Sequence, residues 1–359
     1  MTDAPISPLP AGSVIGILGG GQLGRMLSVA ASRLGYACHI YEPGTAPAGD
    51  VAHALTTAPY DDEAALRAFA ASVDVITYEF ENVPTAALDL LESLRPIRPN
   101  RRALAISQDR IPEKEFLNGL GLATAPFRAV GSEADLAAAV AALGCPSILK
   151  TTRLGYDGKG QVRLESPDEG PAAWAAMKGA AAVLEGFVAF EREVSVIVAR
   201  GLDGSVACYD PGENVHQGGI LRTTTVPARL SANQRTDAVL LAARIVNALD
   251  YVGVMGVELF VTPSGLVVNE IAPRVHNSGH WTQNGCTVDQ FEQHIRAVTG
   301  LPLGDGGRHA DVVMENLIGE DLTRVPALLR ARDVALHLYG KGEARPGRKM
   351  GHANRIVRR

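Results

Sequence analysis

Residues 252–280 read VGVMGVELFVTPSGLVVNEIAPRVHNSGH, and this stretch predicts a β-hairpin that carries two acidic side chains. Two apolar runs, VGVMGVELFV and GLVVNEI, flank a TPSG segment whose Pro and Gly favour a turn. With the turn centred on Ser264, Glu258 and Glu270 each lie six residues away on opposite strands. Antiparallel pairing then places their Cβ atoms about 5 Å apart on one face. Such a pair repels unless a cation lies between the carboxylates, so we expect a hard divalent cation such as Mg²⁺.

The residues around this pair are dense in polar groups. Asn269 adds a neutral oxygen beside Glu270, and Arg274, His276 and Asn277 follow within a few residues. A surface hairpin with two solvated glutamates is the alternative. The apolar flanks and the polar cluster disfavour it, because clustered ionisable groups on a buried frame mark functional sites more often than plain surface.

Composition suggests a globular enzyme of two or three domains. The chain has 359 residues, 46% of them hydrophobic and 20% charged, and a formal net charge of −5. This balance argues against a general nucleic-acid binder. The four cysteines are widely spaced, which favours reduced thiols. We see neither a signal peptide nor an apolar run of membrane-spanning length, and we expect a cytoplasmic protein without a membrane partner.

The first strand of the chain leads into a glycine-rich turn. The run VIGIL at Val14–Leu18 suits a buried parallel strand, and Gly19, Gly21 and Gly24 follow in a G-x-G-x-x-G pattern. Glu42 ends a second predicted strand, in the position of the acid that contacts a ribose. This fingerprint favours NAD, but the signal is weak. The same turn can hold the phosphate or ribose of another ligand.

Acidic residues follow the third predicted strand, at residues 73–78. Glu79 and Glu81 come directly after it, at the edge where open α/β sheets bind ligands. We take these carboxylates as candidates for substrate hydroxyl or amine contacts, with solvated loop acids as the equal alternative.

A second glycine-rich segment follows a strand that ends at Lys150. The sequence TTRLGYDGKGQVRL holds Gly155, Gly158 and Gly160, with Lys159 between the last two. It lacks the Walker pattern, and a strand instead of a helix follows. A glycine hairpin can still lay its N–H groups over phosphates while the two lysines neutralise charge. A plain mobile hairpin is the alternative.

Acidic and basic residues farther along the chain complete the candidates. Glu185 and Glu193 flank a short linker suited to a purine and its ribose, and His216 ends a segment, 213–216, that we place between strands. Lys341, Arg348 and Lys349 are expected in glycine turns, which suit a phosphate. An acidic surface linker, a structural histidine and a solvated basic tail are the alternatives.

Eight motifs together resemble the ATP-grasp superfamily and, within it, the N5-carboxyaminoimidazole ribonucleotide synthetase family, the ATPase subunit of phosphoribosylaminoimidazole carboxylase. They span nearly the whole chain in family order, so the set is far more specific than any one motif. The motifs are GGGQLGRML, YEFENVP, QDR-x-x-EK-x-FLN, KT-x-x-x-GYDGKGQ, EGFV-x-FEREVS, ENVH-x-x-GIL, NEIAPRVHNSGHWT and LYGK followed by GRKMGH.

The resemblance implies a mixed α/β and α+β architecture with an ATP-grasp fold. It implies an N-terminal Rossmann-like parallel α/β domain at 13–108, an ATP-grasp domain at 109–300, and a small β-rich C-terminal domain at 301–359. A homodimer is also implied.

The same resemblance assigns site residues by their place in the motifs. The metal ligands would be Glu258 and Glu270, for Mg²⁺ or for Mn²⁺ in its place. Residues nearest the reaction would be Asp157, Lys159 and Arg274. ATP would be bound by Arg110, Lys150, Gly155, Tyr156, Asp157, Gly158, Lys159, Gly160, Gln161, Glu185, Gly186, Phe187, Val188, Glu193, His216, Asn269 and Glu270. The ribonucleotide would be bound by Gln22, Leu23, Glu79, Tyr156, His276, Asn277, Lys341, Arg348 and Lys349.

The implied activity is an ATP-dependent carbon–nitrogen ligation in purine biosynthesis. ATP would activate bicarbonate as carboxyphosphate, and the carboxyl would pass to the exocyclic amine of aminoimidazole ribonucleotide. Three alternatives remain: a related enzyme that uses formate and glycinamide ribonucleotide, an NAD-dependent oxidoreductase, and a nucleotide-binding module without catalysis. An oxidoreductase would give the paired carboxylates Glu258 and Glu270 no role. The presence of these two acids, of Lys150 and of Arg274 argues against a module without catalysis.

Overall fold

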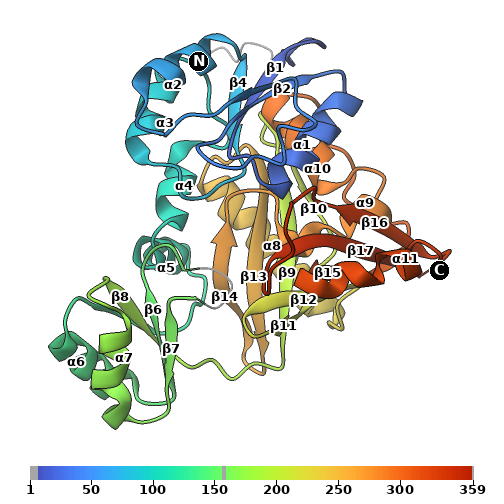
Figure 1. Ribbon diagram of the computed structural model, residues 1–359. Helices are drawn as coiled ribbons and strands as arrows, with labels where there is room; N and C mark the ends of the chain where they lie inside the picture. Colours follow the sequence, from blue (N-terminus) through green and yellow to red (C-terminus); the bar gives the residue numbers. More distant parts are fainter. Residues whose placement is uncertain (1–6, 156–158, 358–359) are drawn as a thin grey trace.

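The computed structural model describes residues 7–155 and 159–357, and its strands form three sheets (Figure 1). The N-terminal sheet lies at one end of the molecule. A small sheet stands off to one side, and a large sheet fills the middle and extends to the C-terminus.

The N-terminal sheet is parallel throughout, in the order β3-β2-β1-β4. Strands β1 and β4 are largely buried, as expected when helices cover both faces of a parallel sheet. This confirms the predicted parallel α/β unit. Its elements are β1 (Val14–Leu18), α1 (Gln22–Arg33), β2 (Ala37–Tyr41), β3 (Ala54–Thr56), α2 (Glu63–Ala71), β4 (Val75–Tyr78) and α3 (Thr85–Glu92).

The small sheet is antiparallel, in the order β5-β8-β6-β7, and has a core of its own. Two helices, α4 (Arg101–Ser107) and α5 (Arg110–Gly119), connect it to the N-terminal sheet (Figure 1). Its elements are β5 (Phe127–Val130), α6 (Glu133–Leu143), β6 (Ser147–Thr151), β7 (Gln161–Leu164), α7 (Gly170–Ala176) and β8 (Ala182–Gly186).

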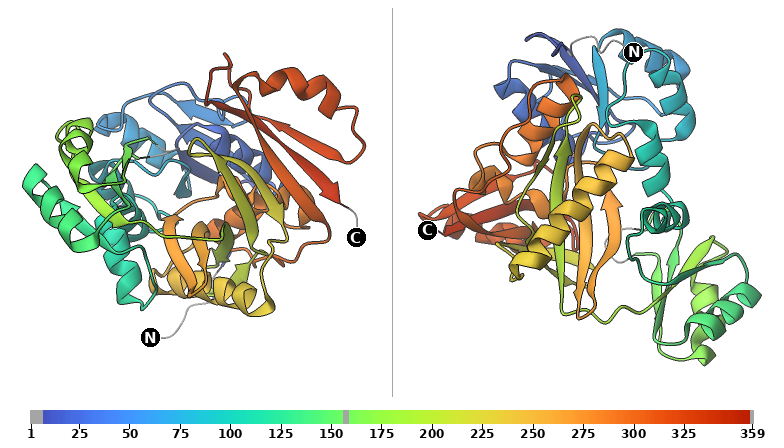
Figure 2. Two further views of the ribbon diagram at one scale, coloured as in Figure 1. Left: turned by 90° about the horizontal axis from the view of Figure 1, so that it is seen from below. Right: turned by 180° about the vertical axis from the view of Figure 1, so that it is seen from behind.

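The large sheet runs β14-β13-β9-β11-β12-β15-β17-β16, with β10 paired to β9. Helix α8 (Ala232–Ala248) packs along β9 and β14 (Figure 2, right), and α10 (Gln290–Thr299) packs on β13. The strands are β9 (Arg192–Arg200), β10 (Val206–Cys208), β11 (Gly212–Gln217), β12 (Ile220–Val226), β13 (Gly253–Thr262), β14 (Gly265–Ala272), β15 (Asp311–Ile318), β16 (Val334–Leu338) and β17 (Lys349–Val357). The short helices α9 (Thr282–Gly285) and α11 (Val325–Leu328) lie after β14 and after β15.

The hairpin of β13 and β14 pairs Glu258 with Glu270, as the sequence predicts, but by a different route. Thr262 pairs with Gly265, so the turn centre falls between Pro263 and Ser264 and not on Ser264. A regular ladder would then pair Glu258 with Asn269. A β-bulge makes Asn269 the extra residue, and the bulge restores the pairing of the two acids.

Two predicted loops are strands. Residues 213–216, which the sequence analysis places between strands, lie in β11, which pairs with both β9 and β12. Lys349, expected in a turn, is the first residue of β17, which pairs with β15 and β16. In both cases the local sequence is polar and does not predict a strand. The strand forms because it pairs with a neighbouring strand on each side.

Among the described residues, no helix combines the length and the apolar character needed to cross a membrane.

Candidate active site

The acidic pair on the hairpin is the centre of the site. The side chains of Glu258 and Glu270 are 15% and 39% exposed, and Arg110 of α5 contacts Glu270 Oε2 at 3.0 Å. Burial and the charge of Glu270 raise the pKa of Glu258. Burial would also raise the pKa of Glu270, but Arg110 and Lys150 lower it. The side chain of Asn269 hydrogen-bonds to Glu258. This set of hard oxygen donors, repelling one another until a cation neutralises them, fits a divalent metal.

Two lysines form ion pairs with the carboxylate of Glu185 on β8 of the small sheet. Lys150 Nζ lies 2.8 Å from Glu185 Oε2, and Lys114 Nζ lies 3.0 Å from Glu185 Oε1. Burial alone would raise the pKa of Glu185, but the two lysines lower it to about 2. Because Lys150 also lowers the pKa of Glu270, it lies within electrostatic reach of the acidic pair. Lys150 and Glu185, both predicted to bind the nucleotide, therefore contact each other in the structure.

The glycine hairpin connects β6 to β7, as predicted. Gly160 has φ of +70°, and a Cβ there would lie 2.7 Å from Thr151 Oγ1, so this position requires glycine. Gly155 packs near Arg110, Lys159 is exposed, and Gln161 begins β7. Tyr156, Asp157 and Gly158 lie outside the described residues.

The segment after β8 lies at the end of the small sheet away from the glycine hairpin, because Ser147 pairs with Gly186 and Thr151 with Ala182. The N–H groups of Gly186 and Phe187 donate to Pro126 O and Pro146 O, so these amides are already used. The ring of Phe187 is 38% exposed and carries the Arg163 guanidinium 4.5 Å from its centroid. Val188 is half-buried beyond the end of the strand. The structure therefore shows one exposed ring in this segment, that of Phe187, and Arg163 lies against it.

Glu193 and His216 form one pair across β9 and β11. His216 Nδ1 lies 2.5 Å from Glu193 Oε2. Burial alone would lower the pKa of His216, but the hydrogen bond and charge of Glu193 raise it. His216 also lies close enough to Glu258 to lower that carboxyl's pKa. The two residues thus belong to the same site as the acidic hairpin.

The glycine turn after β1 is already filled by carboxylates. Gly20 N donates to Glu42 Oε2 at 2.8 Å, and Gly21 N donates to Glu79 Oε1 at 2.8 Å. Gly24 N donates to Glu79 Oε2 at 3.3 Å. These acids occupy the N-terminus of α1, where the pyrophosphate of NAD would bind, and they would repel it. The interpretation as an NAD site is therefore wrong.

Residues of the N-terminal sheet and of the loop after β14 meet at this turn. Gln22 and Leu23 begin α1, and Arg274 lies near enough to Glu79 to lower its pKa, which burial raises. Arg274 Nη2 forms an ion pair with Glu81 Oε1 at 2.6 Å. Glu79 and Glu81, which follow β4, therefore lie beside the predicted catalytic arginine.

The side-chain amide of Asn277 makes no hydrogen bond within the described part of the chain. Its Nδ2 and Oδ1 are buried, and neither contacts a hydrogen-bonding group within the described part of the chain. Buried polar groups in native proteins are nearly always bonded, so an amide left open in a candidate site indicates a ligand. The neighbouring His276 places Nε2 3.4 Å from Glu258 Oε1. The two residues thus extend the site from the acidic hairpin.

The three basic residues of the C-terminal segment separate. Lys349 lies close enough to His276 to lower its pKa, so the structure brings it to the site. Lys341 stands 5.7 Å over the ring of Tyr339, just after β16. Arg348 donates to Glu343 O at 2.9 Å within its own loop. Of the three, Lys349 is the residue whose charge acts on His276 of the candidate site.

Two residues that sequence reasoning left without a role also contact the site. Lys114 binds Glu185, and Glu113 accepts the N–H of Ile271 at 2.6 Å, next to Glu270. Arg110, Glu113 and Lys114 have the i, i+3, i+4 spacing of one helix face, and this spacing is the signal that could have found them.

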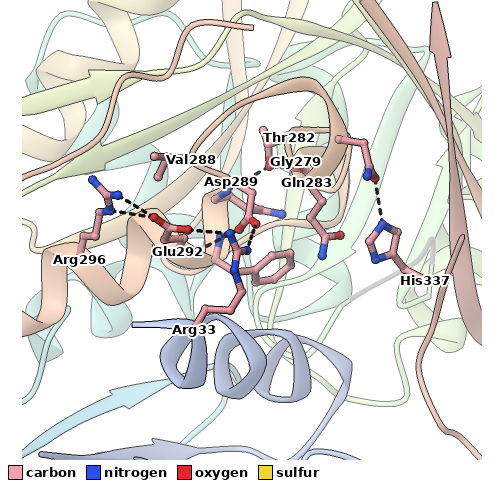
Figure 3. Close-up of polar contacts among 12 residues, drawn as sticks. Arg33, Gly279, Thr282, Gln283, Val288, Asp289, Glu292, Arg296 and His337 are labelled. Carbon is pink, nitrogen blue, oxygen red and sulfur yellow. Dashed lines mark hydrogen bonds and ion pairs between the residues drawn. The ribbon is translucent and has the colours of Figure 1, made fainter. Parts of the chain in front are cut away.

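A cavity of about 270 Å³ lies elsewhere, between α1 and β16. Beside it, Arg33 of α1 forms ion pairs with Asp289 at 3.4 Å and Glu292 at 3.1 Å (Figure 3). His337 of β16 contacts Asn284 at 2.9 Å. None of the predicted site residues line this cavity. Its contacts join α1 to the start of α10, and β16 to α9.

Family models match nearly the whole chain. A ribonucleotide synthetase preATP-grasp domain matches residues 13–108, an ATP-grasp domain matches 115–291, and a phosphoribosylaminoimidazole carboxylase C-terminal domain matches 312–358. The fold is thus an ATP-grasp fold with a parallel N-terminal sheet.

Relatives of the chain share one described activity. The N5-carboxyaminoimidazole ribonucleotide synthase of Brucella melitensis is 58% identical over 97% of each chain, and that of Bacillus subtilis is 42% identical over 95% of this chain and 90% of its own.

Two solved structures are also similar. One is an ADP complex of N5-carboxyaminoimidazole ribonucleotide synthetase, at TM-score 0.95, 41% identity and coverage of 98% of this chain and 94% of that one. The other is the synthase of Aspergillus clavatus with ADP and 5-aminoimidazole ribonucleotide, at TM-score 0.91, 34% identity and coverage of 97% and 94%.

Proposed function

Because the chain belongs to the N5-carboxyaminoimidazole ribonucleotide synthases of the ATP-grasp family, we infer that it is the ATP-dependent ligase of that step in de novo purine biosynthesis. It joins bicarbonate to aminoimidazole ribonucleotide and converts ATP to ADP and phosphate. The observation that carries this function is identity of 58% across 97% of the chain. The paired acids, the lysine-held carboxylate and the open Asn277 amide support it.

The chemistry proceeds in two balanced steps. A bicarbonate oxygen attacks the γ-phosphorus of ATP, ADP leaves, and carboxyphosphate forms. The exocyclic amine nitrogen of the ribonucleotide then attacks the carboxyphosphate carbon, the new C–N bond forms, and phosphate leaves as the amine loses a proton. No protein nucleophile is needed, so the side chains orient the reactants and stabilise negative charge.

We propose the following roles for the residues of the site. Glu258 and Glu270 hold Mg²⁺ or Mn²⁺, which when bound neutralises phosphate oxygens. Lys150, Arg110 and the segment 155–161 bind ATP phosphates. Residues 185–188, Glu193, His216 and Asn269 bind the rest of the nucleotide. Arg274 and Lys159 stabilise the anionic intermediate. The ribonucleotide is bound by Gln22, Leu23, Glu79, Tyr156, His276, Asn277, Lys341, Arg348 and Lys349.

The organisation of the protein completes the proposal. Its domain boundaries fall after residues 108 and 300, it acts as a homodimer, and it works in the cytoplasm. Bicarbonate joins ATP and the ribonucleotide as the third substrate.

ADP release tests the function directly. With Mg²⁺, ATP and bicarbonate, we expect slow release that aminoimidazole ribonucleotide stimulates strongly. Label from bicarbonate should appear in an acid-labile product, because an N-carboxylate loses CO₂ in acid. Stimulation by formate with glycinamide ribonucleotide, and none by aminoimidazole ribonucleotide, would keep the fold and refute the substrate.

Replacing Asp157 by asparagine is expected to lower kcat about a hundredfold while KM for ATP changes less than threefold. We propose Asp157 as the base or orienter of the amine, and an amide cannot take its proton. Steady-state kinetics with varied ATP and ribonucleotide measure both constants. Asp237→Asn, at an exposed position of α8, makes the same change of charge and serves as the control. An unchanged kcat would remove Asp157 from this role.

A further inference from the structure

The imidazole of His276 has one nitrogen beside Glu258 of the acidic pair and one that faces the inside of the protein. Its side chain is 12% exposed, and Nε2 lies 3.4 Å from Glu258 Oε1. Nδ1 faces the short 3₁₀ turn Asn277–Gly279 that follows His276. The tautomer therefore decides whether the ring offers the reactants an N–H donor or a lone pair.

The turn itself decides the role of Nδ1. The backbone N–H of Ser278 points at Nδ1 with N···N of 3.4 Å, and Ser278 Oγ lies 2.8 Å from the same nitrogen. A backbone N–H can only donate, so this contact favours an accepting Nδ1, although at 3.4 Å it is weaker than the contact with Ser278 Oγ at 2.8 Å. With Nδ1 as the acceptor, the ring hydrogen of the neutral imidazole is on Nε2.

A buried chain of polar groups supports the same assignment from the other side. Thr224 Oγ1 donates to Asn214 Oδ1 at 2.9 Å, and Asn214 Nδ2 donates to Ser195 Oγ at 3.0 Å. Ser195 Oγ donates to Ser278 Oγ at 2.7 Å, which leaves the Ser278 hydroxyl hydrogen for Nδ1. These groups come from β12, β11 and β9 and are at most 6% exposed. Every donor in the chain points toward His276, so the network has one direction.

The backbone of His276 is fixed as firmly as its ring. Gln290 Oε1 accepts His276 N–H at 2.9 Å, and Gln290 Nε2 donates to His276 O at 2.8 Å. On the opposite side, a Cβ at Gly256 would come within 2.7 Å of His276 Cβ, so the side chain of His276 packs directly against the backbone of β13. The imidazole thus cannot rotate to exchange its nitrogens without breaking several buried contacts.

We propose that Ser278, Ser195 and Asn214 are positioning residues that fix His276 as a neutral Nε2–H donor facing the anionic reactants. The proposal rests on the proposed function, since bicarbonate and carboxyphosphate are the anions in question. Their oxygens are acceptors, so an N–H preoriented toward them stabilises charge without a proton transfer. His276 then acts as a donor, and the base lies elsewhere.

The test combines nitrogen NMR with kinetics. In protein carrying ¹⁵N-histidine and no substrates, the His276 signals, assigned with His276→Gln, should show a protonated Nε2 and an unprotonated Nδ1 at neutral pH. Ser278→Ala should shift them toward a mixture of tautomers. It should also lower kcat roughly tenfold or more with KM for ATP little changed, because a misplaced donor costs transition-state stabilisation. Ser205→Ala, in an exposed turn, is the matched control and should match wild type in both readouts.

An isosteric change tests the direction of the chain. An aspartate carboxylate at position 214 accepts and cannot donate, so Asn214→Asp makes Ser195 donate to it and frees Ser278 to accept from His276. This variant should move the hydrogen toward Nδ1 and lower kcat as Ser278→Ala does.

Two results would overturn the proposal: a protonated Nδ1 in the wild type, or a Ser278→Ala protein with wild-type tautomer and kcat. The wild-type spectrum decides the point even if the variants fold poorly. A wild type with the expected tautomer but no ribonucleotide-stimulated ADP release would refute the function and leave the tautomer assignment standing.

Discussion

Replacing Glu270 by glutamine is expected to lower kcat/KM for ATP on the order of 10³-fold. Glu270 is half of the acidic pair on the β13–β14 hairpin and also contacts Arg110 at 3.0 Å. An amide keeps the shape and an oxygen but loses the charge that attracts a divalent cation and orients the arginine. ADP release at several Mg²⁺ concentrations measures the loss.

The Mg²⁺ dependence separates a metal ligand from other roles. If Glu270 binds the cation, raising Mg²⁺ should recover part of the activity, since the remaining carboxylate and the amide oxygen still coordinate weakly. Glu258→Gln should behave alike. Glu63→Gln on α2, whose acid pairs with Arg67 on the surface, serves as the control. Relief of repulsion and loss of the Arg110 contact oppose one another, so Tm should change little. A loss that no Mg²⁺ concentration relieves would contradict the metal role.

The hairpin shows what a sequence can predict and where it falls short. Turn residues and two apolar runs predict the strands, and the equal spacing of Glu258 and Glu270 predicts their pairing. The route to that pairing depends on a bulge at Asn269. A single extra residue leaves almost no trace in an apolar run, because either register keeps apolar side chains on both faces of a buried strand.

The glycine turn after β1 shows a different limit. Its G-x-G-x-x-G pattern is compatible with a dinucleotide, and the spacing of Glu42 matches that fingerprint. The structure instead directs Glu42 and Glu79 onto the turn's own N–H groups. Which group fills a helix N-terminus depends on a strand far along the chain, and no local pattern reports it. The resemblance of the whole chain corrects what the single motif suggests.

The residues that hold the site together were the hardest to predict. Lys114 and Ser278 act on neighbours that the motifs do identify, through contacts that only the tertiary structure brings about. Motif positions report residue types that touch ligands. The second layer is recognisable only when burial and hydrogen-bond partners are known, because a buried lysine and a surface lysine look alike in sequence.

Replacing Glu185 by glutamine is expected to destabilise the protein by about 3–5 kcal/mol at neutral pH. Glu185 is 5% exposed and neutralises Lys114, which is 2% exposed, as well as Lys150. Glutamine leaves the Lys114 ammonium buried without a counter-charge, and that costs far more than loss of a surface pair. Urea unfolding followed by circular dichroism measures the change.

The cause of the loss can be isolated by removing the lysine as well. Lys114→Met in the Glu185→Gln background should recover most of the lost stability, because the uncompensated charge is gone. Lys114→Met alone should cost less than Glu185→Gln, since Lys150 still pairs with the acid. Additive effects of the two changes would show that the residues act independently, against the contact at 3.0 Å.

The pH dependence of the difference in unfolding free energy between wild type and Glu185→Gln is an independent test of the ion pair. The two lysines lower the pKa of Glu185 from its ordinary 4.5 to about 2 in the folded protein. The folded value lies below the unfolded one, so the stabilisation is complete above pH 4.5 and is lost as pH falls toward 2. A shift of this size corresponds to roughly 3 kcal/mol, in line with the buried-pair argument. The gap in unfolding free energy between wild type and Glu185→Gln should therefore shrink from pH 7 to pH 3. A gap that stayed constant would mean that glutamine acts through packing, and that the ion pair contributes little.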